Sequence, residues 1–439
     1  MVNLQNLYQQ LQQISPLRAL QIFNVGRQGS LILIAILLAQ FHLSTADLGN
    51  YEQLLFLGHL LSFFLVSGLI QGMLSHYPDL TAERQRRFLF NALLLFLSLG
   101  FIVLVLGWSA RELLWNYVLH REQLYFYDLF LIYVCLNFSS FLIENHLVLQ
   151  QKGWAILRYG VLSFGAQTVA MVLPIYMGWD FQYSFYGLIV IGVARVSYLL
   201  ALVWQQASWT VDLELMQSWV EIAWPLVLYA ILGGLLPAFD GWLVGYFFDG
   251  DEKMFAVFRY GAQELPLALA LTNAFSNVMV VEVARDPRAA LPLIKAKSLR
   301  LFHVLFPLSI VLMLLSPVLF PWIFNADFAE SATIFQVYLF VIISRLVFSS
   351  TIMIGLKANR ALTWIGGLEL LTNLILSYFL GRTFGLAGIA LGTLIAFSME
   401  KILQSLFLYR KQGISPKEYL DFKWYFGYSA LLLLAFLLT

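Results

Sequence analysis

The sequence predicts an all-α polytopic membrane protein, and its charge content and apolar blocks lead to that fold class. Of its 439 residues, 60% are hydrophobic and 12% are charged, whereas soluble proteins carry roughly 25% charged residues. The apolar residues form long blocks, many of which exceed the roughly 20 residues that a helix needs to cross a bilayer. Backbone polar groups in hydrocarbon must be satisfied within the segment, so each block is predicted to be a helix.

Twelve spanning helices are predicted, in two runs of six. The first run covers 16–42, 47–76, 86–108, 124–150, 153–178 and 182–206. The second covers 216–247, 253–283, 300–322, 332–356, 361–380 and 386–409. A last apolar block, 424–439, is too short to span the roughly 30 Å core upright. It is predicted to form a short, peripheral thirteenth helix.

The loops predict the orientation of these helices. Lysine and arginine near helix ends stay in the cytoplasm. Alternate loops are rich in them: Arg84, Arg86, Arg87, Lys152, Arg285, Arg288, Lys295, Lys297, Lys357, Arg360, Arg410 and Lys411. The intervening loops hold only Arg111, Arg121, Lys253 and Arg382. This asymmetry predicts a multi-pass protein with a cytoplasmic amino terminus.

The midpoint of the chain suggests a division into two lobes. We expect an N-lobe at 1–206, a cytoplasmic linker at 207–215 and a C-lobe at 216–409. The remaining 410–439 combines a basic segment with the short apolar helix. The lobes also resemble each other in outline, because 44–53 and 249–260 occupy matching places in the two halves. A two-fold repeat of this kind is the usual framework for alternating access.

Polar side chains recur inside the predicted helices, where they are costly and usually face a cavity or a partner. Several share a helix face by their spacing. These candidates are Gln21, Asn24, Arg27 and Gln28 in the first helix, Glu52, His59, Ser67 and Gln71 in the second, Asp240 in the seventh, and Arg259, Gln263, Glu264, Asn273 and Asn277 in the eighth. Four such helices, two from each half, predict one shared hydrated cavity.

Structural roles for the same residues stay open. Buried arginines could pair with buried acids and lock helices together, for example Arg27 with Asp240 or Arg259 with Glu264. His59 alone is more often a packed, hydrogen-bonded histidine. Glu52 lies near a helix end, where its side chain could snorkel to the interface.

Motifs of enzymes are missing from the sequence. There is no HExxH, GxSxG, glycine-rich phosphate loop or cysteine–histidine metal spacing. We therefore predict no catalytic residues, no metal site and no cofactor. Nucleic-acid binding has no exposed basic element to use.

The late stretch 355–411 carries a family resemblance. A basic turn is followed by a helix with Asn373 and then by FGLAGIALGT, in which Gly385, Gly388 and Thr393 stand. This pattern resembles the polysaccharide-transporter branch of the multidrug/oligosaccharidyl-lipid/polysaccharide (MOP) superfamily, the O-antigen flippase type. ADLGNY at 46–51 resembles the first outer loop of that family.

The resemblance implies two six-helix lobes around a central cavity lined by the first, second, seventh and eighth helices. It also implies transport of an undecaprenyl-pyrophosphate-linked oligosaccharide, a lipid-linked anionic glycan, across the bacterial cytoplasmic (inner) membrane. The cations and amides expected to bind this substrate are Arg27, Arg259, Arg195, Arg345, Asn24, Gln28, Gln263, Asn273 and Asn277.

Ion coupling has its own candidates. Asp240 is an acid deep in the seventh helix, three residues after Pro237, and could exchange H⁺ or bind Na⁺. Glu264, Glu52 and His59 are further titratable candidates. Membrane lipid is the other expected partner, because the lipid tail of the substrate would stay in the bilayer.

Two alternative functions remain open at this point. A drug or organic-cation antiporter of the same superfamily should have an acid-rich cavity, whereas this one mixes acids with arginines. A membrane polysaccharide polymerase or glycosyltransferase would need a large outer loop with paired carboxylates, which the sequence lacks.

Overall fold

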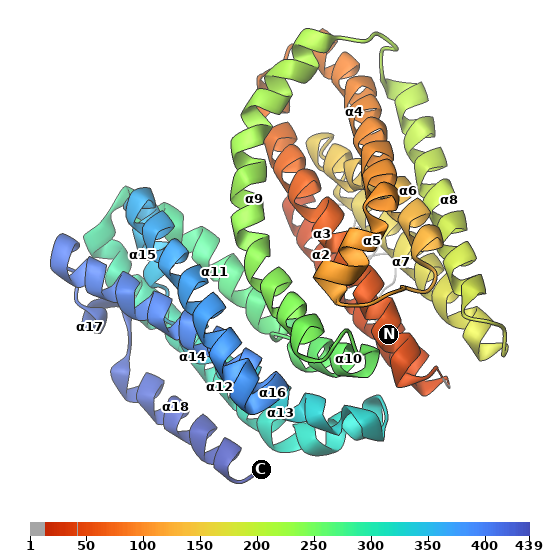
Figure 1. Cartoon of the computed structure of the whole chain (residues 1–439). Coiled ribbons are helices and arrows are strands. Elements are labelled where there is room, and N and C mark those ends of the chain that lie inside the picture. Colours follow the sequence, from red (N-terminus) through yellow and green to blue (C-terminus); the bar gives the residue numbers. More distant parts are fainter. Residues whose placement is uncertain (1–13, 42) are drawn as a thin grey trace, which may run out of the picture. The chain divides into compact units, whose positions relative to one another are not determined.

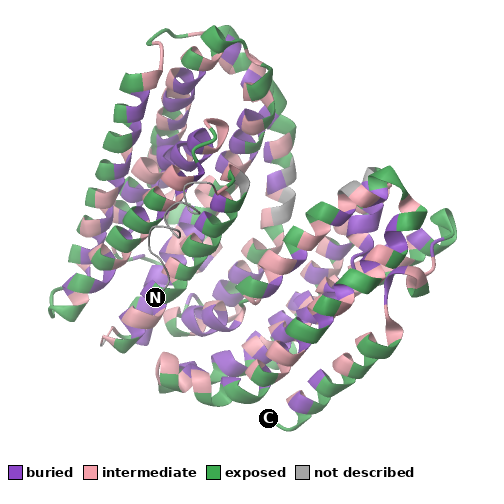
Figure 2. Ribbon diagram, turned by 180° about the vertical axis from the view of Figure 1, so that it is seen from behind, coloured by how far each residue is buried: buried purple, intermediate pink, exposed green. Residues whose placement is uncertain are grey.

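The computed structural model describes residues 14–41 and 43–439, and every regular element in that part of the chain is a helix (Figure 1). Ten of these helices are long and apolar enough to cross a membrane. Exposed residues, green in Figure 2, recur along these helices, and many of them are large and apolar. Val161 and Trp204, for example, are each 75% exposed. The chain is therefore a multi-pass membrane protein with an all-α fold.

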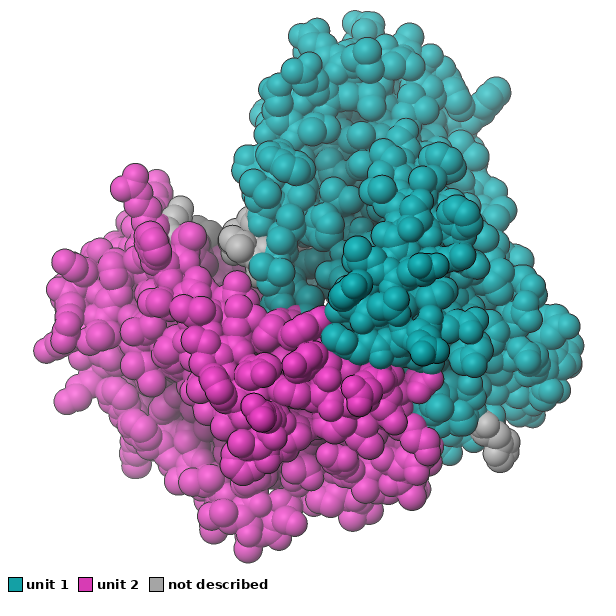
Figure 3. Space-filling view, viewed as in Figure 1, with its two compact units in different colours: residues 1–238 teal, residues 239–439 magenta. Residues whose placement is uncertain are grey.

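Contacts divide the chain into two compact units, residues 1–238 and 239–439 (Figure 3). The boundary falls inside the helix α9 (Leu213–Phe247), so the first part of that helix packs with unit 1. The division into the predicted lobes 1–206 and 216–409 remains a prediction about the moving parts.

The described part of unit 1, residues 14–41 and 43–238, contains six long helices before α9. They are α2 (Pro16–Gln40), α3 (Thr45–His76), α4 (Ala82–Ser109), α6 (Tyr127–Leu149), α7 (Gly153–Tyr176) and α8 (Gln182–Gln206). Ser15, Ser44 and Thr81 cap the first three, each accepting a backbone N–H with its side-chain oxygen. Shorter elements are η1 (Tyr77–Asp79), α5 (Arg111–Leu113) and η2 (Leu114–Leu119).

Small residues let α3 approach α9 closely within unit 1. A side chain at Gly68 would collide with Val227, and one at Gly72 with Ala223. Trp219 of α9 is buried and donates its indole N–H to the Leu69 carbonyl at 3.0 Å. Close backbone contact at small residues is the usual means of packing helices in membranes.

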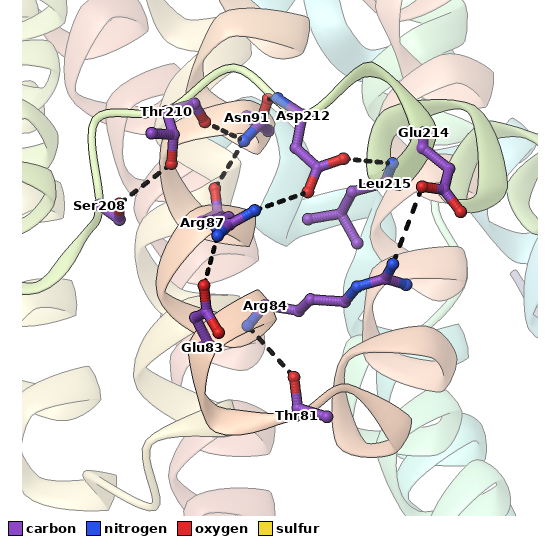
Figure 4. A network of polar contacts seen from close by, with 10 residues as sticks. All are labelled: Thr81, Glu83, Arg84, Arg87, Asn91, Ser208, Thr210, Asp212, Glu214 and Leu215. Atoms are coloured by element: carbon purple, nitrogen blue, oxygen red, sulfur yellow. Dashed lines mark hydrogen bonds and ion pairs between the residues drawn. The ribbon is translucent and has the colours of Figure 1, made fainter.

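The predicted linker 207–215 is fastened to the start of α4 (Figure 4). The buried amide of Asn91 donates to the carbonyls of Arg87 and Thr210 and accepts from the Asp212 N–H at 2.9 Å. Arg87 also pairs with Asp212 at 3.6 Å. The linker is therefore held to unit 1 by side-chain hydrogen bonds rather than being a loose connection.

Unit 2 contains the remaining helices. They are α10 (Glu252–Gly261), α11 (Pro266–Arg285), α12 (Pro287–Ile323), η3 (Ala326–Phe328), α13 (Ala329–Leu339), α14 (Val341–Arg345), α15 (Ser349–Gly355), α16 (Asn359–Gln412), α17 (Pro416–Tyr419) and α18 (Phe422–Leu437). Non-helical Gly385 divides α16 into two arms. The arms match the predicted helices 361–380 and 386–409.

Two predicted helices of this unit are broken. The stretch 253–283 is α10 and α11, separated before Pro266, which lacks an N–H and pushes Leu265 out of helical geometry. The stretch 332–356 is α13, α14 and α15, with left-handed Phe348 before α15. The expectation of one continuous helix over 253–283 was therefore wrong, although Gln263, Asn273 and Asn277 are exposed.

The short helix α18 packs against α12 in the same unit. Leu432 and Ala435 are buried there, and the Tyr425 hydroxyl donates to the Ile343 carbonyl at 3.2 Å. His303 of α12 also hydrogen-bonds the Tyr428 hydroxyl at 2.8 Å. The sixteen-residue helix is thus a packed part of unit 2.

Candidate functional site

Unit 1 has exposed amides at membrane depth. On α2 the side chains of Gln21, Asn24 and Gln28 are exposed, and on α3 those of His59 and Gln71 are exposed. The imidazole of His59 stacks on Phe63, with ring centroids 4.4 Å apart. Exposed polar groups are expensive in hydrocarbon, so this face is suited to water or to a polar ligand.

Arg27 lies beside these amides but points to a protein partner. Its guanidinium forms an ion pair with Glu144 of α6 and lies over the Phe23 ring at 4.9 Å and the Phe141 ring at 5.0 Å. The Glu144 side chain is buried, whereas that of Arg27 is 30% exposed. Within unit 1, the partner of Arg27 is therefore Glu144, and its pairing with Asp240 stays a prediction.

A second arginine of unit 1, Arg195 of α8, is buried among neutral oxygens. It donates to Ser163 at 2.8 Å and Gln167 at 2.7 Å on α7, and to Asn137 at 2.6 Å and Tyr133 at 3.3 Å on α6. These bonds give Arg195 a role in joining three helices.

Unit 2 presents its own polar face. Gln263, Asn273 and Asn277 are exposed, and Arg259 is half-buried. Gln263 donates its amide to the Arg259 carbonyl at 2.8 Å, across the end of α10. The break before Pro266 separates Arg259 and Gln263 from the two asparagines, which are on α11.

Arg345 and Glu264 form a bidentate ion pair. Nε of Arg345 donates to Oε2 of Glu264 at 2.7 Å, and NH2 donates to Oε1 at 2.6 Å. Such paired hydrogen bonds are the strongest arginine–carboxylate geometry. The expected pair of Arg259 with Glu264 is thus replaced, and Arg345 is already engaged by a carboxylate.

Asp240 lies in a cluster of oxygens in unit 2. Its Oδ2 accepts from the Thr393 hydroxyl at 2.8 Å and from Tyr338 at 3.5 Å, and Asn373 and Ser377 face the same carboxyl group. Asp240 is 4% exposed, and in the described part of the chain no lysine, arginine or histidine pairs with it. We call these five residues the Asp240 cluster.

Glycines of α16 build this cluster. Gly385 has φ 61° and ψ −140°, a conformation that favours glycine, and it turns the helix back along itself. A side chain at Gly388 would collide with the backbone of Leu380, and one at Gly392 with that of Ser377. The two arms can therefore meet closely enough for the Asn373 amide to donate to Thr393 at 2.9 Å.

The cluster has the donor set of a monovalent cation or proton site. Buried Oδ1 of Asp240 and Oδ1 of Asn373 both lack a hydrogen-bond donor among the residues that the structure describes. A hard cation takes oxygen ligands of this kind, and a proton on Asp240 would also supply the missing donor. In residues 14–41 and 43–439, no group of three His, Cys, Asp or Glu side chains could hold a metal ion.

The remaining candidates differ in position. Glu52 is buried, with 6% exposure, whereas His59 is exposed. Sequence reasoning named Asp240 but missed Tyr338 and Ser377 altogether. Asn373 and Thr393 were recognised only as part of a family pattern. Their signal was a set of polar side chains among the glycines of two adjoining apolar helices.

No family model and no characterised protein matches the chain by sequence. Solved structures do resemble it. A lipid II flippase MurJ in an inward closed conformation has 14% identity and a TM-score of 0.68, covering 95% of this chain and 97% of that one. An inward-facing multidrug resistance MATE transporter of the MOP superfamily has 14% identity and a TM-score of 0.63, covering 93% and 94%.

A third structure is a MOP superfamily transporter from Pyrococcus furiosus, described as having a binding pocket of reverse polarity. It is 13% identical, with a TM-score of 0.58, and the alignment covers 91% of this chain and 96% of that one. At these identities the likeness shows the fold alone. The chain therefore has the fold of MOP superfamily transporters.

Proposed function

We propose that the chain is a flippase that moves a lipid-linked anionic oligosaccharide across the bacterial cytoplasmic membrane by alternating access. The observation that carries the proposal is that each unit exposes amides at membrane depth: those of α2 in unit 1, which also carries Arg27, and those of α11 in unit 2. Amides hydrogen-bond sugar hydroxyls, and arginine matches the geometry of a pyrophosphate.

Anion recognition is proposed for Arg27 and Arg259. The side chain of Arg27 is partly exposed and Arg259 is half-buried, so each has a surface that a ligand can reach. A pyrophosphate would compete with Glu144 for Arg27. Arg195 and Arg345 are bound to protein groups on several bonds, and their proposed contribution is to hold helices and to add positive potential.

Coupling to an ion is proposed for the Asp240 cluster. Binding of Na⁺ or H⁺ would satisfy Oδ1 of both Asp240 and Asn373, which come from α9 and from the first arm of α16. The second arm contributes Thr393. An ion bound there would fasten three helix segments together, and its release would free them. The amino terminus is proposed to be cytoplasmic, following the basic loops.

The runner-up is a drug or organic-cation antiporter, because MATE transporters share the fold. An organic cation needs an accessible acid. Glu144 and Glu264 are both engaged by arginines, and Asp240 and Glu52 are buried. This placement favours the anionic substrate. A polymerase or glycosyltransferase has less support, because the fold is that of transporters.

Binding of the purified protein to defined ligands tests the proposal. Native mass spectrometry with undecaprenyl-pyrophosphate oligosaccharide, the same lipid without sugar, and a lipophilic organic cation separates the classes. We expect retention of the pyrophosphate lipids and stronger retention with the glycan. Retention of the organic cation alone would favour the antiporter, and conversion of the lipid would indicate an enzyme.

A further inference from the structure

A second buried acid lies on α16, one helical turn from the Asp240 cluster. Glu369 is four residues before Asn373, so the two side chains share a face of the first arm. It is 8% exposed. In the described residues it has no hydrogen bond and no ion pair, which is unusual for a buried carboxyl group.

The charged groups around Glu369 leave one negative charge without a partner. Its charge interacts with those of Glu400, Lys401 and Arg345. Lys401 is paired with Glu400 at 2.7 Å, and Arg345 is paired with Glu264 at 2.6 Å. Two cations are thus matched by two other carboxylates. An ionised Glu369 would be the fifth charge, buried and facing the like charge of Glu400.

The elements packed against α16 add little to this balance. Arg345 is at the end of α14, α15 carries no titratable residue, and α13 contributes Tyr338 beside Asp240 and Glu330 in its first turn. Gln404 donates to Glu400 at 2.6 Å, so the Glu400 carboxyl group is engaged by Gln404 as well as by Lys401. The side chain left to take up a proton is Glu369.

We propose that Glu369 is a proton-binding site of unit 2, distinct from the Asp240 cluster. A proton fits better than a metal ion, because a metal ion needs several ligands, while a proton needs only one carboxylate oxygen. On release, the carboxylic O–H bond breaks and the proton passes to water. The resulting carboxylate has no cation of its own, because Lys401 and Arg345 remain paired with Glu400 and Glu264.

The role of the Glu369 proton in transport rests on the proposed transport function. The spacing of one turn between Glu369 and Asn373 lets the charge at one site affect ion binding at the other. Proton uptake at Glu369 and ion binding at Asp240 would then be two coupled events within one unit. The bound proton itself can be measured without any transport.

Infrared spectroscopy of the full-length protein in lipid at neutral pH tests the site. Protonated carboxyl groups show a C=O stretching band that carboxylates lack. We expect Glu369→Gln to remove the equivalent of one group from this band and to leave the unfolding temperature unchanged. An unchanged band would overturn the proposal.

Glu330→Gln is the matched control, because it removes an exposed acid at the start of α13. It should leave both the band and the unfolding temperature unchanged, and loss of the band in this variant would contradict the assignment to Glu369. If Glu369→Gln does not fold, Glu369→Asp decides: it keeps a carboxyl group, so the band should persist at a shifted frequency, and a band unchanged in frequency would overturn the proposal. Failure of a flipping assay would contradict the role of Glu369 in transport, but not proton binding at Glu369.

Discussion

Arg27→Ala removes the cation that faces the buried Glu144 carboxylate, and we expect it to destabilise the protein as well as weaken substrate binding. Removing one partner of a buried ion pair costs about 3–5 kcal/mol, because the other charge stays buried. The side chain of Arg27 is 30% exposed, and Arg195 also interacts with Glu144. Both features reduce the cost, so we expect about 2–3 kcal/mol.

A double-mutant cycle separates the two roles of Arg27. In Arg27→Ala/Glu144→Gln the buried charge is gone, and we expect at least half of the lost free energy of unfolding to return. Unfolding in detergent, followed by tryptophan fluorescence, measures it. The control is Arg158→Ala, an exposed arginine of α7, for which a change within about 0.5 kcal/mol is expected.

The outcome of the cycle decides between the interpretations. A double variant as unstable as Arg27→Ala would refute the ion pair as the cause. If the double variant is stable but binds no pyrophosphate lipid, Arg27 acts in recognition. If it is stable and flips substrate at the wild-type rate, the proposed recognition role of Arg27 is wrong.

Three further predictions follow from the packing. Gly392→Ala forces a methyl group against Ser377 and should lower the free energy of unfolding by about 1–3 kcal/mol. Gly366→Ala, with no atom within 4 Å of the added carbon, should be neutral or stabilising in thermal unfolding, and equal losses in the two variants would contradict the close approach of the two arms. Asn91→Ala removes two hydrogen bonds to the linker, so it should lower the free energy of unfolding by about 1–2 kcal/mol and speed hydrogen exchange at 208–213. Glu214→Ala loses only an exposed ion pair at 3.8 Å and should do neither. Unchanged exchange in Asn91→Ala would show that these hydrogen bonds do not hold the linker. Deletion of 422–439 should lower the unfolding temperature, because α18 packs on α12, but should leave flipping per folded molecule intact. Loss of substrate binding by the folded deletion variant would show that α18 belongs to the transport core.

The sequence predicted the helices well because apolar blocks of membrane length have few alternatives to helix. The structure confirms the all-α membrane fold and gives helices close to the predicted bounds, for example α8 at 182–206. The breaks before Pro266 and at Phe348 were missed. Apolar character continues through both, and only the local backbone geometry separates the helices.

The partners of buried charges were harder to predict. The sequence places Arg27 and Asp240 in helices, but which carboxylate meets which arginine depends on how helices rotate against each other. Glu369 was not singled out. The Asp240 cluster assembles from α9, α13 and both arms of α16, so its members are up to 153 residues apart in the chain. Spacing within one helix cannot reveal such a set.

Flipping of the proposed substrate is the most direct test of the central claim. The purified protein is reconstituted in vesicles with fluorescent undecaprenyl-pyrophosphate oligosaccharide, and the fraction of label accessible to a membrane-impermeant quencher is followed under Na⁺ or pH gradients. We predict protein-dependent flipping that one of these gradients accelerates, with the acceleration lost in Asp240→Asn. The account would be contradicted if the labelled lipid moved no faster than in empty vesicles while the same preparation showed gradient-driven efflux of an organic cation.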